Sequence, residues 1–335
     1  MASPLCRCCR SQRAGPIKPK IQGVPLFTPP PIETTRPALS LPAAPGLSAT
    51  AASNILNADL HCHSIVSDGT LTPEVLAERA SANGVELWAL TDHDEIGGQH
   101  RAAAAARANG MRYLTGTEIS VTFAGNTVHI VGLGFDPDDE DMVKGLRQTR
   151  GGRTERAMEM AEGLAKVGIH GSYEGALKFV GNPELISRTH FARFLVESGV
   201  CRETPEVFRK YLTEGKPGYV EHRWASLRDA VHWITNAKGM AIIAHPARYK
   251  FTPNEEYALF TEFKAHGGRG VEVVTGSHSP PEYVKYAETA REFGLAASRG
   301  SDFHSPDESH TDLGTLPFLP GALTPVWELL ADRIQ

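Results

Sequence analysis

The chain of 335 residues has few cysteines and no long apolar stretch. Three of its five cysteines, Cys6, Cys8 and Cys9, lie close to the start, and an odd count with this scatter excludes a disulfide framework. Cys62 stands between two histidines and is interpreted as a small buried residue. No run reaches the ~18 apolar residues of a membrane-spanning helix, so no membrane association is expected. These absences predict a cytoplasmic protein with reduced thiols.

Basic side chains are scarce outside the N-terminal segment. Residues 1–56 carry six Lys/Arg residues against one acid, whereas the rest of the chain carries 28 basic and 38 acidic side chains. A body this acidic excludes a general nucleic-acid coat, so no DNA partner is expected, and a phosphate ligand needs a local basic pocket or metal ions. Residues 1–56 are rich in Pro, Ala and Ser and are predicted to be a disordered tail. The oligomeric state is left open.

Short β-like runs alternate with helical segments from residue 57 onward, which is typical of an α/β fold with a parallel sheet. The predicted strands cover residues 58–62, 85–91, 112–118, 127–132, 240–244, 270–274 and 295–299. Two β-prone runs flank the turn Ala124-Gly125-Asn126, which predicts a hairpin over residues 119–132. Thr72 followed by Pro73 predicts the start of a helix, and a second helix is predicted over residues 99–109.

The strand pattern disappears between residues 141 and 216. Helices are predicted there over residues 142–167, 173–180, 188–198 and 204–213. We therefore assign residues 137–218 to a helical insertion within an α/β domain that spans residues 57–335. The insertion is expected to cap the substrate site.

Histidines and carboxylates recur in short clusters near the carboxyl ends of the predicted strands. They are His61, His63, Asp68, His93, Glu118, His129, His245, Asp302 and His304. Parallel α/β barrels build active sites on this face, because the strand ends converge there. Imidazole and carboxylate ligands suit Mn²⁺, Fe²⁺ or Zn²⁺, and nine ligands serve two or three ions if each ion takes three or four. The sequence therefore predicts a multinuclear hydrolase on a distorted, seven-stranded barrel.

The clusters resemble the motifs of the polymerase and histidinol phosphatase (PHP) domain family. The motifs are His61-Cys62-His63-Ser64 with Ser67-Asp68-Gly69, Leu90-Thr91-Asp92-His93-Asp94, Gly116-Thr117-Glu118, His129, Ala244-His245-Pro246 and Ser301-Asp302-Phe303-His304. The resemblance implies a (β/α)₇ barrel with two or three divalent ions, Mn²⁺ foremost, that hydrolyses phosphate esters. It implies one ion held by His61, His63, Glu118 and Asp302, a second by Glu118, His129 and His245, and a third by Asp68, His93 and His304.

The nearest subgroup of that family contains nucleoside 3′,5′-bisphosphate phosphatases and a related 5′-to-3′ exoribonuclease. The insertion carries Arg188-Thr189-His190-Phe191-Ala192-Arg193, which is similar to the subgroup's Arg-x-His-x-Ala-Arg signature except that Thr189 stands where Pro is expected. Arg188, His190 and Arg193 are therefore candidates for binding a second phosphate, as is Lys216. The alternative is that these basic side chains form a solvated helix face and bind no phosphate. A small phosphorylated nucleotide or a short RNA end is the expected ligand.

The expected reaction removes the 3′-phosphate of nucleoside 3′,5′-bisphosphates through a hydroxide that bridges the metal ions. Asp94 and His304 are candidates for protonating the leaving hydroxyl, although Asp94 could instead cap the following turn. Trp224 is expected to pack against the barrel, with stacking on a base as the alternative. An exoribonuclease on short RNA, a histidinol-phosphate phosphatase and an amidohydrolase are the alternative functions.

Overall fold

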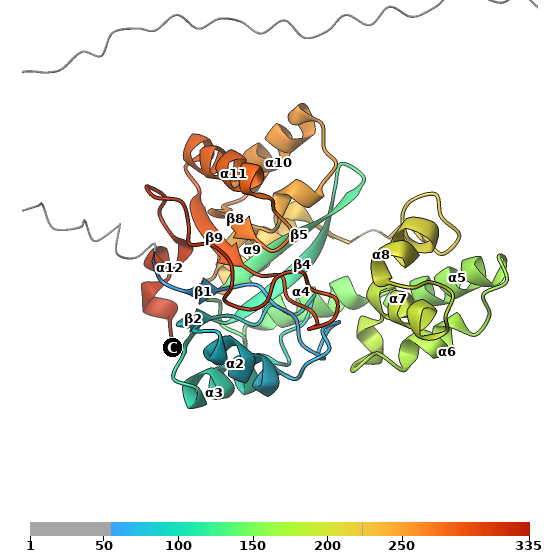
Figure 1. Ribbon diagram of the computed structural model, residues 1–335. Helices are drawn as coiled ribbons and strands as arrows, with labels where there is room; N and C mark the ends of the chain where they lie inside the picture. The colour runs from blue at the N-terminus through green and yellow to red at the C-terminus, as the bar shows by residue number, and fades with distance from the viewer. Residues whose placement is uncertain (1–54, 223) are drawn as a thin grey trace, which may run out of the picture. The chain divides into compact units, whose positions relative to one another are not determined.

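The computed structural model describes residues 55–222 and 224–335, so nearly all of the predicted tail over residues 1–56 lies outside the described residues. A three-stranded parallel sheet has the order β1-β2-β3, with β1 (Ala58–Asp59), β2 (Leu87–Trp88) and β3 (Arg112–Tyr113). A six-stranded sheet has the order β6-β4-β5-β7-β8-β9, with β4 (Gly116–Phe123), β5 (Asn126–Leu133), β6 (Ala225–Ser226), β7 (Met240–Ile243), β8 (Gly270–Thr275) and β9 (Ala296–Gly300). Figure 1 shows α10 and α11 on one side of the strands and α2 and α3 on the other.

Backbone contacts join the two sheets. His93 and Glu118 form an isolated parallel bridge, as do Cys62 and Phe303. The N–H of Leu60 also donates to the carbonyl oxygen of Arg299 over 3.0 Å. The strand ends that carry the clusters therefore meet, and the α/β class is confirmed. The count of seven barrel strands stays a prediction.

Helices follow most strands in the described part of the chain. Outside the insertion they are α2 (Pro73–Ala82), α3 (Gln99–Ala108), α9 (Leu227–Asn236), α10 (Pro253–Ala265), α11 (Pro280–Phe293), α12 (Val326–Leu329) and the short turns η3 (Pro246–Arg248) and η4 (Ala331–Arg333). Thr72 caps α2, because its hydroxyl accepts a hydrogen bond from the backbone N–H of Val75. None of the helices in the described residues combines the length and the apolar character needed to cross a membrane.

Between residues 140 and 212 the described structure is helical. The elements are α4 (Glu140–Arg150), α5 (Arg153–Ala165), α6 (Ser172–Leu177), η1 (Pro183–Leu185), α7 (Arg188–Glu197), α8 (Thr204–Val207) and the π-helical turn η2 (Phe208–Leu212). The prediction of one helix over residues 142–167 is wrong. Gly151 and Gly152 interrupt it, and Gly152 has a left-handed φ of 81° that other residues rarely adopt.

The strand predicted over residues 112–118 is also wrong as a single element. It is split into β3 and β4, and β4 begins at Gly116, where a Cβ would lie 2.6 Å from the carbonyl oxygen of Leu90. The predicted hairpin is confirmed. β4 and β5 pair in antiparallel register through Ala124 and Gly125, which both have positive φ as a type I′ turn requires. β5 also runs antiparallel to β7, whereas β7, β8 and β9 pair in parallel.

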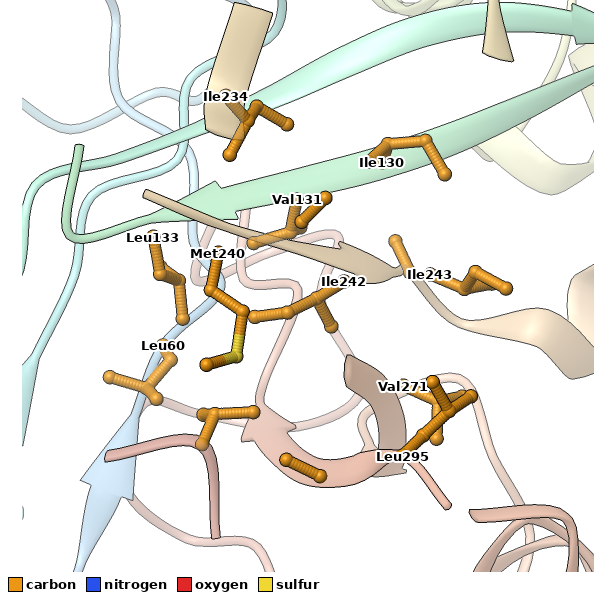
Figure 2. Packing of buried hydrophobic residues seen from close by; sticks show 14 of the residues in the cluster. Leu60, Ile130, Val131, Leu133, Ile234, Met240, Ile242, Ile243, Val271 and Leu295 are labelled. Atoms are coloured by element: carbon orange, nitrogen blue, oxygen red, sulfur yellow. The ribbon is translucent and has the colours of Figure 1, made fainter. Parts of the chain in front are cut away.

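Three hydrophobic clusters organise the described residues. The largest packs the central strands against α9 and its neighbours, and Figure 2 shows part of it around Val131, Met240 and Ile242. A second lies beneath α2 and α3, and a third belongs to the helices from α5 to η2. Met142 and Leu146 of α4 belong to the largest cluster, so the separate helical core begins only at α5. The boundaries 137 and 218 stay a prediction.

Gly145, in the middle of α4, is expected to tolerate no side chain. A Cβ there would lie 2.4 Å from two ring carbons of Trp233. Alanine stabilises a helix relative to glycine by about 1 kcal/mol, but overpacking costs about 1–3 kcal/mol, so Gly145→Ala should lower the free energy of unfolding by up to about 2 kcal/mol. Urea denaturation measures this change. Gly321→Ala is the control, because a Cβ at Gly321 meets no atom within 4 Å, and an equal effect in both variants would contradict the packing argument.

Candidate metal centre

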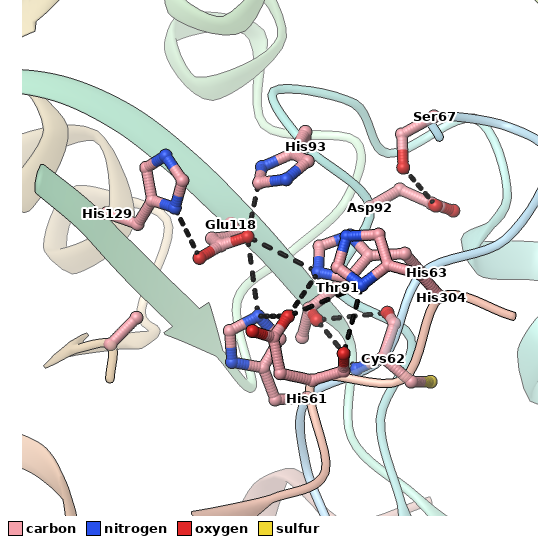
Figure 3. Close-up of polar contacts among 12 residues, drawn as sticks. His61, Cys62, His63, Ser67, Thr91, Asp92, His93, Glu118, His129 and His304 are labelled. Carbon is pink, nitrogen blue, oxygen red and sulfur yellow. Dashed lines mark hydrogen bonds and ion pairs between the residues drawn. The ribbon is translucent and has the colours of Figure 1, made fainter. Parts of the chain in front are cut away.

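The nine clustered residues come together where the strands end. His61 and His63 follow β1 and are fully buried, and Glu118 on β4 is fully buried as well. His93 follows β2, His129 lies on β5, His245 follows β7, Asp302 and His304 follow β9, and Asp68 lies between β1 and α2. Figure 3 shows Glu118 surrounded by histidine rings. Glu118 and His129 lie within β4 and β5 rather than at the predicted carboxyl ends of strands, but all nine residues belong to one site.

Glu118 is the residue that most of the histidines face. Its Oε1 lies 2.8 Å from Nδ1 of His129 and 2.9 Å from Nε2 of His245. Its Oε2 lies 2.9 Å from Nδ1 of His93 and 3.3 Å from Nε2 of both His61 and His63. A single carboxylate therefore joins ligand atoms from several strand ends, as a bridging ligand must.

Asp302 and Asp68 extend the cluster beyond Glu118. Oδ1 of Asp302 lies 3.3 Å from Nε2 of His63, and Oδ1 of Asp68 lies 3.5 Å from Nε2 of His304. The ring of His63 stacks on those of His304 and His93, with centroid distances of 4.1 and 4.4 Å. Because stacked rings bring their nitrogen atoms close together, neighbouring sets of metal ligands share the part of the site around His63.

The carboxylates of the cluster are anionic. Burial alone would raise the pKa of Glu118, but the neighbouring His129, His93 and His61 outweigh it and hold that pKa well below its ordinary value. The same balance, with burial opposed by nearby histidines, lowers the pKa of Asp68 and of Asp302. The three carboxylates therefore supply negative charge within the site, which attracts cations.

Three of the histidines are held neutral, as metal ligands must be. Burial, reinforced by His304 and His93, lowers the pKa of His63 to about 3. Burial also lowers the pKa of His245 to about 4 and that of His129 in the same direction. Burial opposes protonation of His93 as well, but Glu118 and Asp68 outweigh it and raise its pKa to about 9. Metal binding at His93 therefore has to displace a proton.

Unpartnered buried atoms test whether the residues fit metal ions. Among the described residues, buried side-chain atoms without a hydrogen-bond partner include Nε2 of His61, both ring nitrogens of His63, Oδ1 of Asp68, Nδ1 of His93, Oε2 of Glu118, Nδ1 of His129 and Oδ1 of Asp302. Buried polar atoms are normally satisfied, so such a concentration indicates a missing partner. Four groups have ligand atoms within 4.8 Å of one another: His63, Asp68, His93 and His304; His61, His63 and Asp302; His61, Glu118 and His245; and His93, Glu118 and His129. The donor set fits divalent ions.

Two carboxylates that sequence reasoning did not assign support the cluster from outside. Glu272 on β8 lies 2.8 Å from Nδ1 of His61 through Oε1, and its Oε2 accepts a 2.7 Å hydrogen bond from the backbone N–H of His245. Asp92 accepts hydrogen bonds from the hydroxyls of Ser64 and Ser67. A lone acid within the apolar run of β8 was the available signal for Glu272. Such partners orient the groups that bind metal.

An arginine-lined cavity of about 130 Å³ adjoins the cluster. Its lining includes His93, His129 and His304 together with the four residues Arg153, Arg156, Arg188 and Arg248, which we call the cavity arginines. Trp224 also lines it and receives the guanidinium groups of Arg153 and Arg156 over its ring, at 4.6 and 5.5 Å from the centroid. Trp224 can therefore both pack against protein groups and contact a ligand, which are the two alternatives expected from the sequence.

Two of the cavity arginines have no acidic partner. Among the described residues, no carboxylate lies within ion-pair distance of Arg156 or Arg188, whereas Arg153 pairs with Asp94 and Arg248 with Asp302. Arg156 is buried, and burial followed by repulsion from Arg188 and Arg153 lowers its pKa to about 10. A buried guanidinium group such as that of Arg156 is costly without a counter-ion, which indicates that an anion completes this cavity.

The other expected substrate residues lie in different settings. His190 is buried on α7, and its Nδ1 accepts a hydrogen bond from the backbone N–H of Ser187. Arg193 forms a bidentate ion pair with Glu308, whose closest contact is 2.6 Å. Lys216 is exposed and lies outside the residues that line the arginine cavity. Of the four candidates, the structure brings Arg188 into that cavity.

The two candidates for the general acid also differ in their surroundings. His304 lines the arginine cavity, and its Nδ1 lies 2.9 Å from the carbonyl oxygen of Asp302. Asp94 is fully buried and accepts hydrogen bonds from the N–H and hydroxyl of Ser120, at 2.7 and 3.0 Å. His304 is open to a ligand, whereas Asp94 is occupied by protein groups.

Fold and cluster together define an α/β protein that can hold several divalent ions at buried strand ends. Residues 59–216 match the PHP domain family. The chain is 51% identical over 278 residues to the 3′,5′-nucleoside bisphosphate phosphatase of Chromobacterium violaceum, covering 83% of this chain and 98% of that protein. It is 41% identical over 270 residues to a 5′-3′ exoribonuclease of Haemophilus influenzae, covering 81% and 97%. The chain therefore belongs to the PHP domain family.

A solved structure agrees with this assignment. An amidohydrolase from Chromobacterium violaceum, with bound sulfate and no metal, superposes with a TM-score of 0.81 at 51% identity, covering 83% of this chain and 97% of that one. Membership of the PHP family makes the chain a hydrolase of phosphate esters.

Proposed function

We propose that the protein removes the 3′-phosphate of nucleoside 3′,5′-bisphosphates and leaves the 5′-phosphate in place. The observation that carries this proposal is the arginine cavity, where Arg156 and Arg188 lack acidic partners beside a cluster of metal-ligand type. A substrate with two phosphates needs two separate sites of positive charge. The named function of the relative from Chromobacterium violaceum supports the same choice.

The nine clustered residues would hold two or three divalent ions, two of which would share Glu118. The donors are nitrogen and oxygen atoms without thiolate, which suits Mn²⁺ and also Zn²⁺ or Fe²⁺. When bound, such ions lower the pKa of water and stabilise charge on phosphate oxygens. The chain's own groups orient the substrate. The guanidinium groups of Arg156 and Arg188 bind the 5′-phosphate, which is not cleaved and which we call the distal phosphate, in a bidentate manner. In a two-ion arrangement that leaves His304 without a metal, this side chain at the edge of the cluster would protonate the leaving 3′-oxygen.

Phosphate release from adenosine 3′,5′-bisphosphate, 3′-AMP and 5′-AMP in the presence of Mn²⁺ tests the proposal. We expect kcat/KM for the bisphosphate to exceed that for either monophosphate at least about tenfold, because charge-assisted hydrogen bonds to a second phosphate are worth about 1.5–3 kcal/mol. The nucleotide product should be 5′-AMP, as chromatography will show. Equal rates on all three substrates, or 3′-AMP as the product, would refute the assigned orientation.

A second candidate function is the stepwise removal of nucleotides from short RNA 5′ ends. A cavity of about 310 Å³ opens on the side of Asp302 and His304 and is lined by hydroxyl groups that include those of Ser277, Ser309 and Thr311. Such a polar space suits a nucleoside attached to the scissile phosphate, and a named 5′-3′ exoribonuclease is among the relatives. Incubation with a 5′-phosphorylated RNA trimer tests this, with a 5′-hydroxyl trimer as the control. No release of 5′-mononucleotide would exclude it.

A further inference from the structure

Asp94 lies directly after His93, and strand β4 holds its carboxylate in place. Its Oδ1 accepts a 2.7 Å hydrogen bond from the N–H of Ser120, its Oδ2 a 3.0 Å bond from the Ser120 hydroxyl, and its own N–H donates to the carbonyl oxygen of Glu118 over 2.8 Å. Its φ of 50° lies in the left-handed region, which Asp adopts more readily than most residues. The carboxylate is therefore fixed relative to the strand that carries Glu118.

Arg153 completes the surroundings of this carboxylate. Its Nη2 forms a short ion pair with Oδ2 of Asp94, and its guanidinium carbon lies 4.6 Å from the centroid of the Trp224 ring. Arg153 is 5% exposed and lines the arginine cavity, whereas Asp94 does not. The guanidinium group is thus held at its edge by Asp94 and over the face of an indole, which leaves it with little rotational freedom.

A second arginine, Arg150, contacts the same loop. Nη1 of Arg150 donates to the carbonyl oxygen of Asp94 over 2.8 Å and lies 3.3 Å from Oε2 of Glu95. Gly151 and Gly152 separate the two arginines, at the point where α4 of the main core gives way to α5 of the helical core. The helical core is therefore attached to the loop that carries His93.

We propose that Asp94 is a positioning residue that holds Arg153 ready for the distal phosphate, so that recognition of a second phosphate depends on it. Every hydrogen bond that the Asp94 carboxylate accepts comes from a protein group. The carboxylate therefore has no direct part in proton transfer to the substrate. A guanidinium group that is ordered before binding loses less conformational freedom when phosphate arrives. This inference rests on the proposed function, because it assigns the second phosphate of the bisphosphate to the arginine cavity.

Steady-state kinetics of Asp94→Asn on adenosine 3′,5′-bisphosphate and on 3′-AMP test the inference. The ratio of kcat/KM for the bisphosphate to that for 3′-AMP should fall about tenfold, mainly through a higher KM for the bisphosphate. Arg153→Ala should lower the ratio equally. The double variant should lower it no further, because both changes disrupt the same Asp94–Arg153 pair. Metal content, measured by mass spectrometry, should match the wild-type value.

Glu74→Gln is the matched control, because it breaks a bidentate pair with Arg101 between α2 and α3 and should leave the ratio unchanged. An equal loss of kcat on both substrates in Asp94→Asn would overturn the inference and assign a general-acid role. An unchanged or higher ratio in Asp94→Asn and Arg153→Ala would also overturn it. If Asp94→Asn does not fold, Arg153→Ala and Arg153→Lys decide alone. A wild-type enzyme without bisphosphate preference would instead refute the proposed function.

Discussion

Replacing Glu118 by glutamine should lower kcat/KM about a thousandfold or more on every phosphate ester. The carboxylate lies within 3.3 Å of nitrogen atoms of five histidines, and two of the three proposed ion sites share it. Glutamine keeps the size but removes the charge and offers one acceptor in place of two. A loss of about 4 kcal/mol of transition-state stabilisation corresponds to this factor, which is within the range supplied by metal ions.

The same variant separates metal loss from misfolding. Mn²⁺ at about 100 times its dissociation constant should stabilise the wild-type protein by about 2.7 kcal/mol, which is a rise of several degrees in Tm. Glu118→Gln should show little of this rise while keeping its circular dichroism spectrum. Glu256→Gln, which removes a half-buried carboxylate paired with Lys285 on the outer helices, is the control and should retain both activity and metal response. Full activity in Glu118→Gln would refute the shared-ligand role.

The candidate ligands could be predicted from the sequence because the signal is local. Glu118 and His129 lie within β4 and β5, but most of the clusters follow a strand end, and the convergence of these ends brings residues as distant as His61 and Asp302 within 3.5 Å. The hairpin was predictable for the same reason, since Ala124-Gly125 supplies the turn within the pattern itself. Local patterns, repeated at equivalent positions in the fold, were sufficient for this part of the site.

The arginine cavity could not be predicted because its parts are joined only in three dimensions. Arg153 lies 59 residues from its partner Asp94, and at the start of a helix it has the same sequence signal as a solvated side chain. The sequence instead favoured Arg193, which the structure pairs with Glu308 across 115 residues. Contacts between distant segments determine which arginines line the cavity, and such contacts leave no periodic pattern in the sequence. Gly151 and Gly152 interrupt the helices directly before Arg153, whose guanidinium group pairs with Asp94.

Glu272 provides the second large expected effect, because its two oxygens both accept hydrogen bonds from ligand-bearing residues. Oε1 lies 2.8 Å from Nδ1 of His61, and Oε2 lies 2.7 Å from the backbone nitrogen of His245. A glutamine at this position has one acceptor and one donor, so either orientation of its amide sets a donor against a donor. We expect Glu272→Gln to weaken apparent Mn²⁺ affinity about 10- to 100-fold, as loss of a ligand-orienting carboxylate commonly does.

Saturating metal should restore most of the activity of Glu272→Gln, because all nine proposed ligands are still present. Titrating activity against Mn²⁺ gives the apparent affinity and the maximal rate separately, and the same titration should find Glu118→Gln inactive at every concentration. Thr275→Val is the matched control on β8, since the Thr275 hydroxyl is buried and has no hydrogen-bond partner among the described residues. Wild-type affinity in Glu272→Gln, or a loss that metal does not reverse, would show that Glu272 does not act by orienting His61 and His245. Recovery with metal would show that Glu272 keeps the ligands in position before ions bind. A buried carboxylate outside the ligand set can act at this stage.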